Sequence, residues 1–143
     1  AFDCMPGSPS RTPKKGFVSA LIEKIRGKPG PKKREVWFVN NADLGIQDPD
    51  TTKHPALVMK TNGPTIEVLR GTSDKGRYPT DVVSIQPSDV EIRDGERGLK
   101  DETFFSLLRR RIWPNLPVPF VSVAGTLRAD RFDEVRALSD AAM

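Results

Sequence analysis

Short runs of apolar residues, separated by polar and turn-forming residues, occupy the middle of the chain. Two of them alternate apolar and polar positions, which is typical of strands that bury one face. The runs cover residues 36–39, 56–59, 65–69 and 81–85, with a shorter one at 120–123. Asn62-Gly63-Pro64 lies between the second and third runs and predicts a tight turn, and therefore a hairpin.

Residues 129–142 have the period of a helix instead. The apolar side chains expected to face inward from it are Phe132, Val135 and Leu138. Residues 104–113 fit both the helical and the strand period. Short strands in series with helices at the ends suggest a small barrel.

The N-terminal part of the chain has a different texture. It is rich in Pro, Ser and Gly, and a short helix is predicted over about residues 13–27, with Pro13 at its first position and Gly27 at its end. We expect residues 1–33 to form a basic extension and residues 34–143 to form one domain.

Charge is divided unevenly along the chain. Residues 1–34 hold nine basic and two acidic side chains, whereas residues 35–143 hold 14 basic and 17 acidic ones, within a net charge of +4. A basic arm attracts polyanions, because neutralising phosphates releases counterions. A solubilising tail is the alternative, and composition alone favours it.

The totals narrow the class of protein. A chain of 143 residues is long enough for one core. No apolar run approaches the roughly 20 residues that span a bilayer, so no membrane association is expected. Cys4 is the only cysteine, which excludes an intrachain disulfide and a cysteine-built metal site. We expect a cytoplasmic protein that uses neither a metal nor another cofactor.

Three segments carry a family resemblance, in order along the chain. Residues 33–39 (KREVWFV) are similar to an opening strand, residues 53–58 (KHPALV) to an Arg-Pro-Ala-Leu-Val block, and residues 71–83 (GTSDKGRYPTDVV) to a Thr/Ser loop leading into the next strand. Weaker matches are Gly98-Leu99-Lys100 and Gly125-Thr126-Leu127. Together these segments resemble the MazF/PemK family of toxins.

The resemblance implies an α+β fold, a small SH3-like β-barrel with an N-terminal and a C-terminal helix, in which residues 104–113 form a strand. It also implies a homodimer that binds single-stranded RNA and is held in check by a cognate antitoxin protein, as in type II toxin-antitoxin systems. The family's reaction needs no metal. The ribose 2′-hydroxyl attacks the adjacent phosphate and leaves a 2′,3′-cyclic phosphate and a 5′-hydroxyl.

The resemblance also suggests which residues act. Thr72, or Ser73 beside it, would donate a hydrogen bond to the scissile phosphate. The position of the family's arginine holds His54, the only histidine. A neutral histidine can act as a base, but it lacks the two-pronged phosphate grip of arginine. The residues expected to bind RNA are Gln47, Lys53, Lys75 and Arg77.

Other interpretations stay open. A lone histidine is more often a packing residue than a catalyst, and residues 72–76 also fit an ordinary polar loop. The missing arginine favours a catalytically inactive barrel that binds nucleic acid or a partner protein. A toxin that inhibits DNA topoisomerase would need a C-terminal motif that we do not find.

Two further groups have alternative roles. Arg109 and Arg111 would share one face of a strand, with Arg110 on the other. These arginines would either bind RNA or, more commonly, lie in solvent at the edge of the sheet, where their charge discourages pairing with a strand of another molecule. Trp37 and Trp113 are suited to stack on bases, but we expect both to fill the core.

Overall fold

The computed structural model describes residues 30–61, 63–78, 81–113 and 119–142. The chain divides into two compact units, Ala1–Gly30 and Pro31–Met143. All described residues except Gly30 belong to the second unit. The helix expected over residues 13–27 lies outside the described residues.

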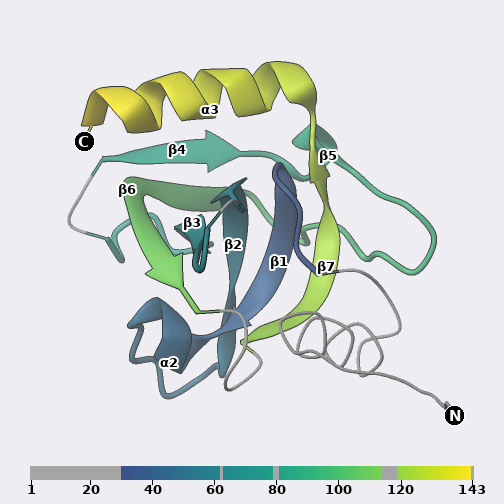
Figure 1. Cartoon of the computed structure of the whole chain (residues 1–143). Helices are drawn as coiled ribbons and strands as arrows, with labels where there is room; N and C mark the ends of the chain where they lie inside the picture. The colour runs from purple at the N-terminus through teal and green to yellow at the C-terminus, as the bar shows by residue number, and fades with distance from the viewer. Residues whose placement is uncertain (1–29, 62, 79–80, 114–118, 143) are drawn as a thin grey trace, which may run out of the picture. The chain divides into compact units, whose positions relative to one another are not determined.

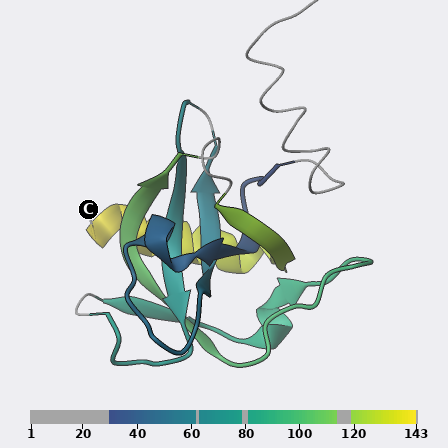
Figure 2. The ribbon, with the colours of Figure 1, turned by 90° about the horizontal axis from the view of Figure 1, so that it is seen from below.

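In the described part, the second unit is a single curled sheet with two helices. The strands are β1 (Glu35–Asn40), β2 (Lys53–Lys60), β3 (Ile66–Thr72), β4 (Val82–Ile85), β5 (Val90–Glu91), β6 (Thr103–Ile112) and β7 (Phe120–Leu127). The helices are α2 (Asn41–Leu44) and α3 (Ala129–Ala142), and a 3-10 turn, η1, spans Pro87–Asp89. The strand order is β4-β6-β3-β2-β1-β7-β5, and all neighbours are antiparallel. Helix α3 lies along β4 (Figure 1), behind the curled strands when seen from below (Figure 2).

The predicted strands are all present. Residues 104–113, which fit two periods, belong almost entirely to β6. β2 and β3 form the expected hairpin, with Val58 paired to Val68. A small, sheet-rich domain with a C-terminal helix is therefore confirmed, and the SH3-like type of barrel stays a prediction.

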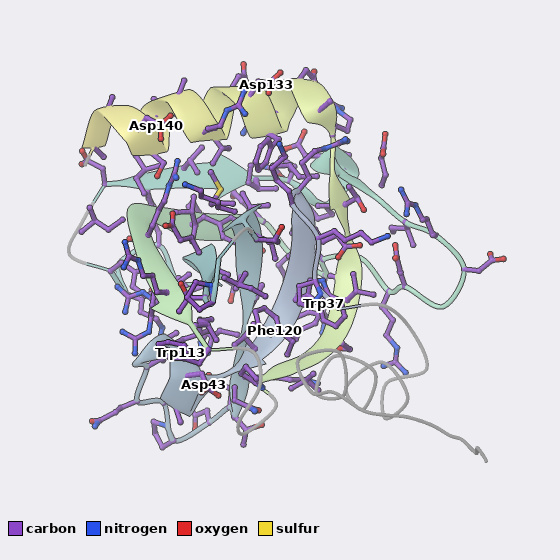
Figure 3. All side chains as sticks on the ribbon, in the orientation of Figure 1. Trp37, Asp43, Trp113, Phe120, Asp133 and Asp140 are labelled. Atoms are coloured by element: carbon purple, nitrogen blue, oxygen red, sulfur yellow. The ribbon has the colours of Figure 1, made fainter. Side chains whose placement is uncertain are left out.

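Buried apolar side chains lie on both faces of the sheet. Successive residues of a strand point to opposite faces, and both sets of residues include apolar ones. In β1, Val36 belongs to one buried cluster and Trp37 to the other. Trp37 meets Phe120 edge to face, with ring centroids 6.0 Å apart and an interplanar angle of 87° (Figure 3). Irregular register between β1 and β7 bends the strands and helps the sheet curl. Both faces are thereby buried, one inside the curl and one under α3.

Helix α3 docks with a face slightly different from the predicted one. Phe132 and Val135 are buried as expected, but Leu138 is 48% exposed and Ser139 is buried in its place. With about 3.6 residues per turn, position 139 falls between the directions of 132 and 135, whereas 138 falls outside them. The Ser139 hydroxyl donates to the Leu107 carbonyl at 2.7 Å, so this buried polar group has a hydrogen-bond partner.

The expectation for Trp113 was wrong, and the expectation for the arginine run holds only in part. Trp113 is 60% exposed and does not fill the core, unlike Trp37. It follows the last residue of β6, where the strand leaves the sheet. The arginine run is only in part the solvated charge expected, because the side chain of Arg109 is 14% exposed whereas that of Arg111 is 76% exposed.

Each arginine of that run has an internal partner. Arg109 pairs with Glu67 at 3.4 Å and also with Asp140. Arg111 reaches the same Glu67 at 3.9 Å, while Arg110 donates to the Asp43 carbonyl at 2.7 Å. The predicted alternation of faces is therefore confirmed.

Replacement of Phe132 should reveal how strongly α3 stabilises the fold. Phe132 is 2% exposed, so Phe132→Ala should lower the free energy of unfolding by about 3–5 kcal/mol through lost burial and a new cavity. The measurement is urea unfolding followed by circular dichroism. Leu138→Ala is the matched control and should change stability by no more than about 0.5 kcal/mol. A large loss for Leu138→Ala would contradict the docking face described above.

Candidate active site

A hollow of about 260 Å³ opens at the N-terminal end of β2. Its walls come from β1, the loop before β2, the end of β3 with the loop that follows, and the approach to β6. We call it the His54 hollow. Of the seven residues predicted to act, the five that line it are Lys53, His54, Thr72, Ser73 and Arg77.

Gln47 and Lys75 are not brought to this hollow. Both are exposed and neither lines it. Gln47 adjoins Asp48, whose carboxylate faces His54, but Gln47 itself does not line the hollow. Lys75 lies at the tip of its loop, where the Asp74 carboxylate accepts the backbone N–H of residue 76.

His54 is held in one orientation by an amide. The residue is 7% exposed, and Nδ1 of its ring lies 2.6 Å from Oδ1 of Asn41. The Asn41 amide nitrogen donates to the Thr51 carbonyl at 2.8 Å, which turns Oδ1 toward the ring. Nδ1 must therefore carry the proton, because Oδ1 can only accept. The lone pair of a neutral ring is then on Nε2.

Nε2 of His54 faces a carboxylate that is itself strongly held. Asp48 Oδ2 lies 3.6 Å from Nε2 and 3.1 Å from a terminal nitrogen of Arg77. The hydrogen bond from the backbone N–H of Asp50, followed by those from Thr51 and the charge of Arg77, lowers the pKa of Asp48 against the effect of burial. Asp48 is therefore an anion at neutral pH.

The environment keeps His54 neutral. Burial lowers the pKa of His54 below 6.5, and the positive charge of Arg77 lowers it further, while Asp48 opposes both. A neutral ring with a lone pair on Nε2 is the form that accepts a proton. Once the ring is protonated, the neighbouring Asp48 carboxylate would stabilise its positive charge.

The loop after β3 presents hydroxyl groups to the same hollow. Thr72 is buried, and its Oγ1 accepts the backbone N–H of Asp74 at 3.1 Å, whereas Ser73 is exposed. The backbone N–H of Arg77 donates to the Asp74 carbonyl and closes the turn. Two hydroxyls and a guanidinium thus lie on one short, hydrogen-bonded segment.

Two arginines of the sheet hold the segment that carries Asn41 and Asp48. Arg110 of β6 donates to the Asp43 carbonyl at 2.7 Å, and Arg70 of β3 to the Leu44 carbonyl at 3.2 Å. These carbonyls belong to the last turn of α2, where cations are favourable. The sheet therefore fixes the loop from which His54 receives its partners.

Sequence reasoning missed three of these residues, Asn41, Asp48 and Arg70, and it gave Arg110 a different role. Asn41 follows β1 directly, and the pairing of Val39 with His54 brings it near the ring. That proximity depends on strand register, for which the sequence offers only the hydrophobic pattern.

The described residues contain no group of three or more His, Cys, Asp or Glu side chains placed to hold a metal ion. Within the same residues, no helix has the length and apolar character needed to cross a membrane. No model of a known protein family matches the chain, and no curated protein sequence matches it significantly. The resemblance to MazF/PemK toxins therefore rests on its motifs alone.

The protonation of His54 can be followed directly, because it is the only histidine. In an NMR titration its imidazole signals should change with a midpoint below pH 6.5, since burial and Arg77 disfavour the charged ring. Arg77→Gln should raise the midpoint, because a cation is removed. Asp48→Asn should lower it, because an anion is removed.

Lys60→Gln is the control for a general change of charge. Lys60 is exposed and lies at the opposite end of β2 from His54, so the midpoint should not move. A wild-type midpoint at or above 6.5, or equal shifts in all three variants, would rule out this account of the site.

Proposed function

We propose that this protein is the toxin component of a type II toxin-antitoxin system, a metal-independent endoribonuclease of the MazF/PemK type that cleaves single-stranded RNA. One observation carries the proposal. The KHPALV segment and the Thr/Ser loop, which are separate in sequence, meet at the His54 hollow, where the imidazole of His54 is held in one orientation. The family's homodimer, antitoxin and SH3-like barrel belong to the same proposal.

In the proposed reaction, Nε2 of His54 removes the proton of the ribose 2′-hydroxyl. The 2′-oxygen then forms a bond to the adjacent phosphorus, and the bond from phosphorus to the 5′-oxygen breaks. The departing 5′-oxygen takes a proton from water. The products are a 2′,3′-cyclic phosphate and a 5′-hydroxyl.

Charge that builds on the phosphate needs donors and cations already in place. Lys53 and Arg77 bring positive charge to the hollow, and the hydroxyls of Thr72 and Ser73 are the neutral donors. In this scheme His54 supplies the base, and the cations of two neighbouring segments replace the phosphate grip of the family's arginine. Asp48 stabilises the imidazolium that forms during the step.

Cleavage should depend on His54 and on the 2′-hydroxyl. Purified protein should cut unstructured RNA in the presence of EDTA, and His54→Gln should slow cleavage by about 10²–10⁴-fold, because the base is lost. Thr72→Val should slow it by about 10²-fold, because one donor to the phosphate is removed. The measurement is the rate of cleavage of a labelled oligoribonucleotide, with the product ends identified by mass spectrometry.

Two controls accompany this experiment. A substrate with a single 2′-deoxy sugar at the cleavage position should not be cut there, while Lys60→Gln protein should cut normal RNA at the wild-type rate. Equal activity of the wild type and His54→Gln would remove His54 from the reaction. Cleavage of the 2′-deoxy position would exclude the proposed nucleophile.

A second candidate function has its own support. His54 and Arg77 are already bound within the chain, to Asn41 and Asp48, and no arginine occupies the family's position. A catalytically inactive barrel that binds nucleic acid or a partner protein would have such a site. Salt-sensitive RNA binding by the wild type without any cleavage would select this alternative.

A further inference from the structure

A second and larger hollow, of about 760 Å³, lies beside the His54 hollow. We call it the β7 hollow, because residues 121–123 of that strand form one wall. The opposite wall comes from the loop between β5 and β6, which projects away from the sheet (Figures 1 and 2). Phe38, Lys53 and Lys100 line both hollows. A ligand bound at His54 would therefore continue into the β7 hollow.

The two hollows differ in charge. Asp48, Asp74 and Asp101 are among the residues that line the His54 hollow. The charged residues that line the β7 hollow are Lys53, Arg97 and Lys100, with no acidic residue among its described lining. Three cations in a described lining that contains no carboxylate favour an anionic ligand such as a phosphodiester.

The same hollow has an apolar and aromatic wall. Phe38 is only partly buried, and the Lys53 ammonium lies 5.6 Å from the centre of its ring. Val121 is 44% exposed, which leaves a branched apolar side chain facing open space next to the cations. Cations around an aromatic ring are the combination that binds single-stranded nucleic acid, because bases stack on the ring while cations hold the backbone.

Two glycines with left-handed backbone flank the loop segment that carries Arg97. Gly95 and Gly98 have left-handed φ values of 84° and 71°, on either side of Glu96 and Arg97. The N–H of Gly98 donates to the Ala124 carbonyl of β7 at 2.8 Å, and a side chain at position 98 would meet Ile92 at 2.6 Å. The hydrogen bond at Gly98 thus ties the residue next to Arg97 to β7.

We propose that the β7 hollow binds the nucleotide next to the scissile phosphate of an RNA strand. Its base would lie against Phe38 and Val121, and its phosphate would lie among Lys53, Arg97 and Lys100. This inference rests on the proposed function, since it takes single-stranded RNA as the ligand of the His54 hollow.

Binding is tested with a strand that cannot be cut. The probe is a fluorescein-labelled, fully 2′-O-methylated oligonucleotide of about 12 nucleotides, which lacks the nucleophilic hydroxyl. Fluorescence anisotropy gives its dissociation constant at several salt concentrations. Arg97→Gln should weaken binding about tenfold and reduce the slope of log K against log salt by about one phosphate contact.

Arg93→Gln is the matched control, because Arg93 is an exposed arginine of the same loop that does not line the hollow. It should leave the dissociation constant unchanged. Phe38→Leu should weaken binding about tenfold through lost stacking. Val121→Ser tests the same wall from an exposed position should Phe38→Leu fail to fold, with Leu138→Ser as its matched control on α3.

The outcomes separate the two proposals. Equal affinities of Arg97→Gln and Arg93→Gln, or no binding of the probe by the wild type, overturn the β7 hollow as a nucleotide site. Cleavage of RNA that continues unchanged in Arg97→Gln and Val121→Ser overturns it while leaving the nuclease intact. If the wild type cuts no RNA but binds the probe in a way that depends on Arg97 and Val121, the β7 hollow is supported as a nucleotide site and the proposed nuclease function is overturned.

Discussion

The hydrogen bond between Asn41 and His54 is the contact on which the candidate site depends. β1 and β2 pair so that Val39 lies opposite His54, and Asn41 follows immediately after the end of β1. Its amide binds the ring and the Thr51 carbonyl together, and its backbone N–H donates to the Thr52 carbonyl. A single residue therefore joins a strand end, a loop and an imidazole. Without it, neither the tautomer nor the direction of Nε2 would be determined.

The parts of the fold that are predictable from the sequence are those governed by local pattern. Strands bury alternate residues or whole runs of residues, so the apolar positions in the sequence predict the strands. The helical spacing of apolar residues over 129–142 predicts the C-terminal helix in the same way. The same holds for part of the site. Thr72, Ser73 and Arg77 are close in sequence, and Lys53 adjoins His54, so each group stays together in any compact fold.

The rest depends on geometry that the sequence does not display. Asn41 and Asp48 reach His54 only because of strand register and the path of the loop between them. Leu138 has an apolar side chain at helical spacing, yet the face of α3 that contacts the sheet passes through Ser139 instead. Trp113 shows a different limit, because size and hydrophobicity do not tell where a strand ends.

The position of β1 inside the sheet has a consequence for synthesis and folding. β1 pairs with β2, its near neighbour in sequence, and with β7, which is far along the chain; Phe38 lies opposite Ser122. Closing such a long loop is slow compared with forming a local hairpin. A growing chain carries the whole lining of the His54 hollow before residues 121–123, the wall that β7 gives to the β7 hollow. Until β7 arrives, one edge of β1 is open to pairing with other chains.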